Sequence, residues 1–152
     1  MLYIDDDTRR EGQGGDAGLE WWATAYGTWR LAAEIEAMRR FPQFQLRPCT
    51  GMLAWEGSLV STFDCGDSYR IRLIYPPIFP DESPRVAIVE PELDPGTPHL
   101  LIPNRPCLFS DPGPSGYEPA RTTGATMIAW TALWICAYET WQQTGDWPGA
   151  ED

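Results

Sequence analysis

The sequence predicts an α+β fold in which a helix, an antiparallel meander, a long loop and a second helix follow one another. The segments 20–40 and 122–144 repeat their apolar residues with a helical period. Short apolar runs joined by turn residues fill the segment between 44 and 90. The segment 91–119 is rich in proline and predicts a loop with little regular structure.

The first helix is expected over residues 20–40, because Pro42 ends the apolar period. We expect its apolar side to face the core, and this side carries Trp22, Tyr26, Trp29, Leu31, Ile35 and Met38. A basic edge of Arg30, Arg39 and Arg40 remains, which is either a solvated face or a docking surface. The acidic, glycine-rich residues 1–18 are expected to form a flexible tail before a single domain over 19–152.

Four strands are expected at 44–46, 52–63, 68–75 and 85–90. Tight turns between them, such as 64–67, favour an antiparallel meander. In the third strand Tyr69, Ile71, Leu73 and Tyr75 are expected to share one face, while Arg70 and Arg72 point the other way.

The last helix is expected to begin at a threonine cap, Thr122 or Thr123, and to end at Gly145. Its residues 122–138 carry no charge, but their length is marginal for a membrane span and Glu139 follows at once, so a buried helix is favoured. We interpret its apolar series mainly as core and otherwise as a partner surface; the series is Met127, Trp130, Trp134, Ala137 and Trp141.

The composition narrows the class of protein. The formal net charge of −11, from 22 acidic and 11 basic residues, argues against a general nucleic-acid binder. The 4 cysteines form no Cys-x-x-Cys pair, and His99 is the only histidine, so no metal or other cofactor is expected. Residues 1–18 do not resemble a basic targeting segment, which favours a cytoplasmic protein with free thiols.

Several short segments, in order and at sensible spacing, resemble the ubiquitin-conjugating enzyme (UBC-like) family. They are the helix 29–40, Leu-Ala-Trp-Glu-Gly at 53–57, the strand, proline-rich turn and strand at 69–86, Cys-Leu at 107–108, and Tyr-Glu-Pro-Ala at 117–120, which resembles Trp-Ser-Pro-Ala. The resemblance spans about residues 21–141 and implies the UBC-like fold, with a long active-site loop and a C-terminal helix that is unusually rich in tryptophan.

The family's His-Pro-Asn tripeptide is not intact here. Its asparagine stands eight residues before the cysteine, where this sequence has His99, whereas Pro103-Asn104 lies three residues before Cys107. With the Trp-rich ending, this departure resembles divergent bacterial members. Some of these serve antiviral operons of the cyclic-nucleotide (CBASS) type and conjugate a cyclic-nucleotide synthase, and others belong to bacterial ubiquitin-like pathways.

The resemblance implies that Cys107 carries a protein C-terminus as a thioester and passes it to a lysine amine. A thiol with a reference pKa of about 8.5 is only a few per cent thiolate near pH 7, which suffices because sulfur is a strong nucleophile. His99 or Asn104 would donate a hydrogen bond to the developing oxyanion. A carboxylate would accept the proton of the amine; the candidates are Asp111, Glu118 and Asp146, and the family's use of the loop after the last helix favours Asp146.

Two other functions stay open. A non-catalytic binding domain of the same fold would not need Cys107-Leu108. A cysteine hydrolase using Cys107 and His99 would draw its histidine from a distant segment rather than from eight residues away. The expected partner is the carried protein, either a cyclic-nucleotide synthase or a ubiquitin-like protein. The sequence leaves open whether a separate activating enzyme is used and whether a homodimer forms through the aromatic helix. Neither a nucleic acid nor a membrane is expected.

Overall fold

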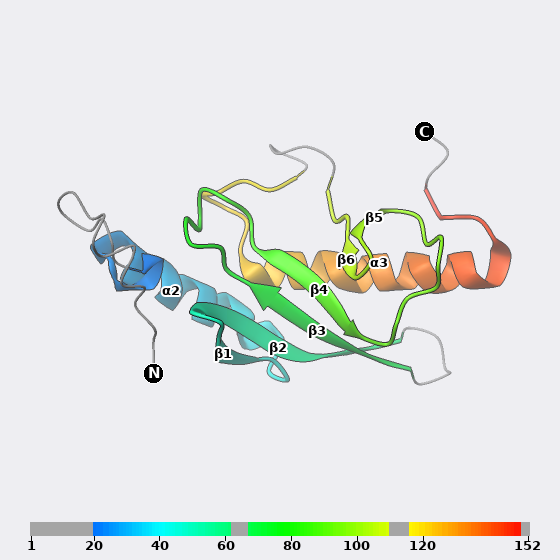
Figure 1. Cartoon of the computed structure of the whole chain (residues 1–152). Coiled ribbons are helices and arrows are strands. Elements are labelled where there is room, and N and C mark those ends of the chain that lie inside the picture. Colours follow the sequence, from blue (N-terminus) through cyan, green and yellow to red (C-terminus); the bar gives the residue numbers. More distant parts are fainter. Residues whose placement is uncertain (1–19, 62–66, 110–115, 150–152) are drawn as a thin grey trace.

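The computed structural model describes residues 20–61, 67–109 and 116–149. The elements, in chain order, are the 3-10 turn η1 (Trp21–Ala23), helix α2 (Ala25–Ala37), the 3-10 turn η2 (Met38–Arg40), strands β1 (Gln45–Cys49), β2 (Met52–Val60), β3 (Ser68–Ile74), β4 (Arg85–Glu90), β5 (Leu100–Ile102) and β6 (Arg105–Pro106), and helix α3 (Gly124–Thr144). The predicted α+β fold of helix, antiparallel meander and Trp-rich C-terminal helix is confirmed (Figure 1). The predicted tail 1–18, Cys65 and Asp111 lie outside the described residues.

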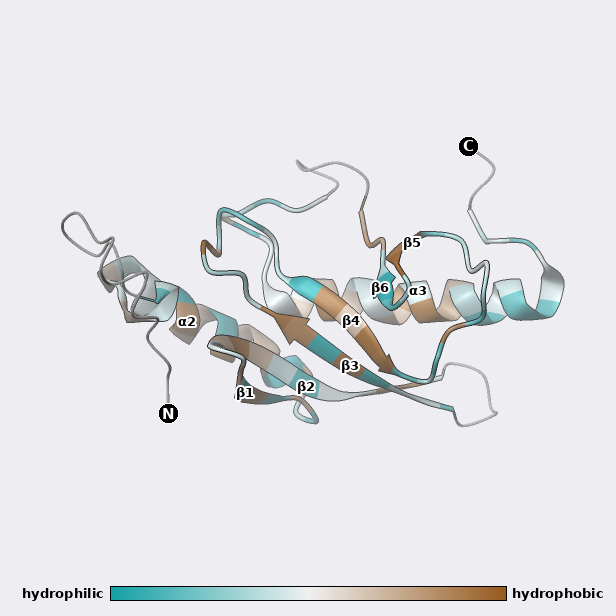
Figure 2. Ribbon diagram, in the orientation of Figure 1, coloured by the Kyte–Doolittle hydropathy of each residue, from teal (hydrophilic) through white to brown (hydrophobic). Residues whose placement is uncertain are grey.

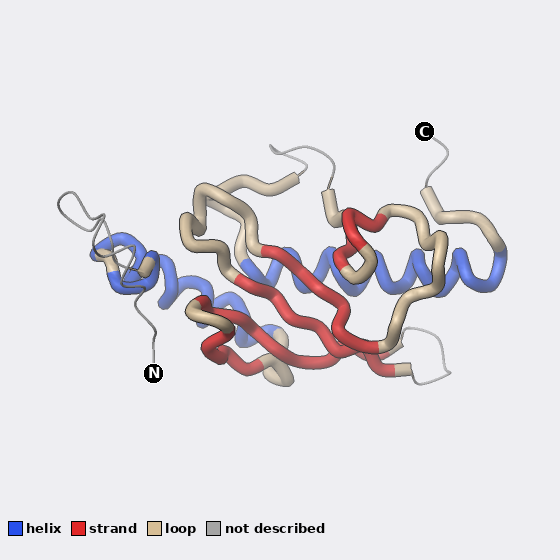
Figure 3. Tube along the Cα trace, in the orientation of Figure 1, coloured by secondary structure: helices blue, strands red, loops and turns tan. Residues whose placement is uncertain are grey.

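The four main strands form one antiparallel sheet in the order β1-β2-β3-β4 (Figure 3). The alternation predicted for β3 is confirmed, because Tyr69, Ile71 and Leu73 are buried. The first strand is longer than the predicted 44–46 and includes Pro48. Proline is tolerated there because β1 is an edge strand, whose outer N–H groups pair with no other strand.

The predicted inner side of the first helix is confirmed in part, because Trp22 and Met38 are buried and Leu31 packs against the core. The buried residues of α2 are Gly27, Arg30 and Glu34, whereas Trp29 is 66% exposed and Tyr26 and Ile35 are also exposed. Gly27 lies so close to η1 that a Cβ atom there would come within 1.5 Å of the Trp21 carbonyl oxygen. The prediction was wrong for Tyr26, Trp29 and Ile35, which are exposed. The close approach of η1 at Gly27 and the polar network of Arg30 and Glu34 take the inner positions of α2 instead.

Arg30 therefore does not belong to a surface basic edge. Its Nε donates to the Glu34 carboxylate at 3.1 Å, and its terminal nitrogens donate to the carbonyls of Pro119 and Thr122 at 2.6 and 2.8 Å. Glu34 in turn accepts the Tyr75 hydroxyl at 2.7 Å and the backbone N–H of Gly124 at 2.8 Å. This Arg30–Glu34 network joins α2 to the start of α3.

Helix α3 runs behind β4 and the β5–β6 hairpin in Figure 1 and reaches past the sheet. The Thr123 side chain caps it, with Thr126 completing a capping box, and Gly145 ends it in the left-handed conformation. Met127 and Trp134 are buried, while Trp130 and Trp141 are partly buried against the same core. No helix among the described residues is long and apolar enough to cross a membrane.

The segment 91–119 holds more regular structure than predicted. Strands β5 and β6 form an antiparallel hairpin whose turn is Pro103-Asn104. The Ile88 N–H donates to the Asn104 carbonyl at 2.8 Å, which attaches the hairpin to β4. The segment 98–106 contains three prolines, which argued against strands there, because proline lacks the N–H that a strand ladder needs. Figure 2 shows β5 as strongly apolar, whereas hydrophilic and hydrophobic segments mix along β3 and β4.

Candidate functional site

Cys107 follows β6 directly and lies at the open end of the hairpin. Its backbone N–H donates to the His99 carbonyl at 2.8 Å, so the two residues are neighbours across the hairpin. Its Sγ donates to the Phe109 carbonyl at 3.4 Å, and its side chain is partly exposed. The hairpin thus holds the thiol at the surface and beside the one histidine of the chain.

The thiol lies at an apolar groove of about 220 Å³ between the hairpin and α3. Cys107 and Leu108 form one side, and the remaining lining residues are Trp130, Leu133, Trp134, Ala137 and Trp147. Leu133 is 70% exposed at the groove, which marks the solvent side of the lining.

Two tryptophans hold His99 in place. The indole Nε1 of Trp134 donates to the His99 carbonyl at 3.1 Å, and the His99 ring packs on the Trp147 ring with centroids 4.9 Å apart. His99 has φ of 59°, in the left-handed region that residues other than glycine uncommonly adopt, although histidine is enriched there with asparagine and aspartate. Both tryptophans also line the Cys107 groove, so His99 and Cys107 share them as neighbours.

Asn104 lies at the other end of the hairpin from Cys107. Its carbonyl is held by Ile88, and its exposed side chain lines a separate cavity of about 430 Å³ between β4 and the loop 91–97. At about 3.3 Å per residue, the three residues to Cys107 span roughly 10 Å of extended chain. Of the two candidate oxyanion donors, His99 is the one whose backbone is bonded to that of Cys107.

The predicted carboxylates differ in their positions. Asp146 is exposed just after α3, its backbone N–H donates to the Thr144 hydroxyl at 3.0 Å, and it precedes Trp147, which lines the groove. Glu118 lies near the start of α3 and pairs with Arg121 at 3.5 Å. Among the described residues, no group of three His, Cys, Asp or Glu side chains could hold a metal ion.

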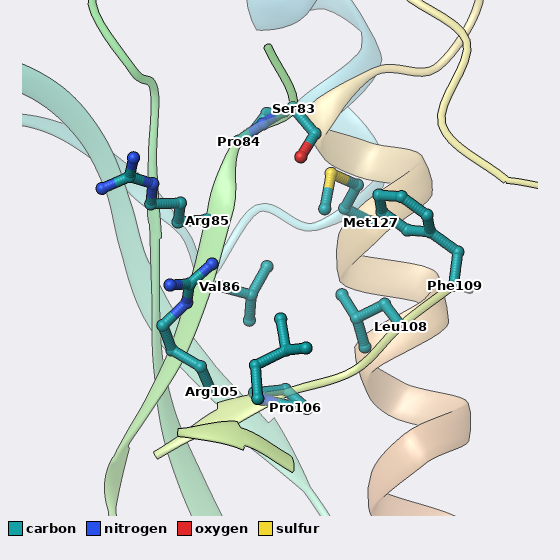
Figure 4. A pocket seen from close by; sticks show the side chains of 10 residues that line it. Ser83, Pro84, Arg85, Val86, Arg105, Pro106, Leu108, Phe109 and Met127 are labelled. Carbon is teal, nitrogen blue, oxygen red and sulfur yellow. The ribbon is translucent and has the colours of Figure 1, made fainter. Parts of the chain in front are cut away.

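The chain after Cys107 is anchored by apolar contacts with α3 and β4. Figure 4 shows Leu108, Phe109 and Met127 together on one side of a cavity of about 110 Å³, with Val86 of β4 on the other side. The Phe109 ring also lies 5.8 Å from Trp130 and 6.3 Å from Tyr117, measured between centroids. These contacts fix the chain that follows Cys107 against α3 and β4.

Tyr117, from the Tyr-Glu-Pro-Ala segment, secures the end of the loop. Its hydroxyl donates to the Pro80 carbonyl, in the turn between β3 and β4. Burial raises the pKa of Tyr117 to about 12, so the hydroxyl stays a protonated donor at neutral pH.

The sequence did not single out Trp134 and Trp147 as neighbours of the site. The helical spacing of Trp134 predicted a core position or a partner surface, and Trp147 follows the end of α3 without a periodic pattern. The one signal in the sequence was the number of tryptophans, because an indole carries an N–H that seeks an acceptor when it is buried.

Fold and site together define a small α+β protein that presents one cysteine thiol on a hairpin beside an apolar, Trp-lined groove. The model of the family described as Type II CBASS E2 protein matches residues 32–152, and the chain belongs to this family. It is thus an E2-like protein associated with CBASS, as the resemblance to divergent bacterial members predicted. A search of curated proteins returned no match.

Proposed function

We propose that the chain is a conjugating enzyme of bacterial antiviral defence that carries a protein C-terminus as a thioester on Cys107 and passes it to an amine. The observation that carries this proposal is the position of Cys107, which is partly exposed and bonded through its backbone to His99. Of the described cysteines, Cys107 is the one that lines the Trp-lined groove. Membership of the Type II CBASS E2 protein family supports the E2-like role.

The chemistry has two steps. In the first, the Cys107 thiolate attacks the carbonyl carbon of an activated C-terminus, a C–S bond forms, and the activating group leaves. In the second, an amine attacks the same carbon, the C–N bond forms, and the Cys107 sulfur leaves and is protonated. The carbonyl oxygen gains negative charge in both steps and needs a positioned donor.

We assign this donor role to the His99 imidazole, which can donate one hydrogen bond when neutral. Its backbone bond to Cys107 and its two tryptophan neighbours support this choice over Asn104 at the far end of the hairpin. Asp146, next to Trp147, is the carboxylate that we assign to the attacking amine.

The carried protein is, in this proposal, the cyclic-nucleotide synthase of the same operon. When the chain is incubated with the products of its neighbouring genes and ATP, one adduct is expected that a thiol reductant removes. Mass spectrometry of the adduct should identify the synthase C-terminus on Cys107. A ubiquitin-like protein in its place would decide for a ubiquitin-like pathway, and no reductant-sensitive adduct with either protein would indicate a binding module.

Replacing His99 by alanine is expected to slow discharge of the loaded thioester to an amine by roughly a hundredfold, because loss of one oxyanion donor typically costs about 3 kcal/mol. His99→Asn should recover part of the rate, since an amide can also donate. Single-turnover chase of the loaded chain with amine measures both variants.

Asn104→Ala is the matched control for the His99 variants, because it removes the rival donor at the other end of the hairpin. It should discharge at close to the wild-type rate. Slow discharge by Asn104→Ala together with normal discharge by His99→Ala would transfer the donor role to Asn104. A large fall in the melting temperature of His99→Ala would instead show a structural role.

A further inference from the structure

The positive charge of this chain is carried by one kind of side chain. All 11 basic residues in its 152-residue sequence are arginines. A guanidinium stays protonated in proteins and offers only donors, so it does not attack a thioester. A lysine amine has a reference pKa of about 10.4 and exposes a neutral, nucleophilic fraction near neutral pH.

The described lining of the groove beside the thiol also offers no nucleophilic side chain. The six residues that line the groove with Cys107 are aliphatic or aromatic, and none of their side chains is an amine, a hydroxyl or a thiol. The nearest cation along the chain is Arg105, which is partly buried, and its Nε has no hydrogen-bond partner among the described residues. Arg105 lines the cavity beside Met127 and not this groove, so a group bound to Cys107 would meet an apolar lining here.

We infer that an acyl group on Cys107 is protected from capture by the side chains of its own carrier, and that the acceptor amine is brought by another molecule. The inference rests on the proposed function and deepens it. In the transfer that it describes, the nitrogen of the external amine bonds to the thioester carbonyl carbon and loses a proton to a base. The C–S bond breaks, and the Cys107 sulfur takes up a proton.

The absence of lysine determines which products the loaded carrier can form on itself. A carrier with a lysine near its thioester would convert part of its load into an isopeptide on itself, which a reductant does not remove. This chain offers no ε-amine for such a product. All of the cargo that it carries on side chains should remain reductant-sensitive until an external amine arrives.

A lysine placed at the groove tests the inference directly. Leu133 is suitable because it lines the groove and is 70% exposed, so a lysine there can reach the thioester without being buried. Trp29 is the matched control, because it lies on a helix, is 66% exposed, and belongs to α2, which lies away from the hairpin in Figure 1.

The probe is a short peptide thioester of mercaptoethanesulfonate, which loads thiols without an activating enzyme. All three chains are acetylated at the α-amine. The wild type is acetylated before loading, and the two lysine variants are acetylated during production. Reductant should remove all label from the wild type. In Leu133→Lys, reductant-resistant label should form at residue 133. It should form at least about tenfold faster than at residue 29 of Trp29→Lys, because proximity raises the effective concentration of the amine.

Reductant-resistant label on the wild-type chain would overturn the inference, since it would reveal capture by another side chain. Equal retention by Leu133→Lys and Trp29→Lys would overturn it as well, because the groove would then not be where the thioester meets an amine. Failure of the proposed function has a different signature. Label on Cys49 and Cys136 that Cys107→Ala leaves unchanged would remove Cys107 as carrier, and the inference with it.

Discussion

Replacing Cys107 by alanine is expected to abolish the reductant-sensitive adduct completely, because a methyl group cannot form a thioester. The variant should fold, since the one side-chain bond that it removes is the 3.4 Å contact from Sγ to the Phe109 carbonyl. The backbone bond from residue 107 to His99 stays. Cys107→Ser should form at most an oxyester, which is more resistant to thiol reductant. Non-reducing electrophoresis and intact mass measure each product.

The other described cysteines supply the controls for Cys107→Ala. Cys49 lies at the end of β1 and Cys136 on α3, and neither lines the Trp-lined groove. Cys49→Ala and Cys136→Ala should therefore keep the adduct at the wild-type level. An adduct that survives in Cys107→Ala would refute the assignment of the carrier thiol, and its loss in Cys136→Ala alone would move the assignment to α3.

Replacing Glu34 by glutamine is expected to lower the free energy of unfolding by about 3–5 kcal/mol, because it leaves the charge of Arg30 buried without its counterion. Glu34 is fully buried, and its carboxylate binds Arg30, the Tyr75 hydroxyl and the Gly124 N–H. Burial and the Glu34 charge both raise the pKa of Tyr75, so that hydroxyl remains a donor. Urea denaturation followed by tryptophan fluorescence measures the change.

Glu36→Gln on the same helix is the matched control for Glu34→Gln. The Glu36 side chain is 74% exposed and pairs with Arg39 at the surface, and such pairs contribute only about 0–1 kcal/mol. The double variant Arg30→Met/Glu34→Leu should lose less stability than Glu34→Gln, because no unpaired charge stays buried. Equal losses for Glu34→Gln and Glu36→Gln would show that the Arg30–Glu34 network does not hold the fold together.

Local patterns predicted the elements well where the residues themselves carry the signal. The alternation of β3, the threonine cap and the glycine end of α3 depend on neighbours in the chain, and the structure confirms each of them. The hairpin in the proline-rich segment was missed because its prolines obscure the strand pattern, and its attachment to β4, from Ile88 to Asn104, joins residues sixteen apart in the sequence. A pattern within a short window carries no information about such a contact.

The sequence by itself determined the order of the main elements and the spacing of eight residues between His99 and Cys107, but it left Asn104 as a rival donor. The backbone contact between His99 and Cys107 comes from the structure. Only the tertiary structure decided which side of α2 is buried, because the inward turn of Arg30 depends on Glu34, Pro119 and Thr122 together. The same holds for the site. Trp134 and Trp147 reach His99 from 35 and 48 residues away, and such contacts depend on how α3 packs against the hairpin, which the helical period of α3 leaves open.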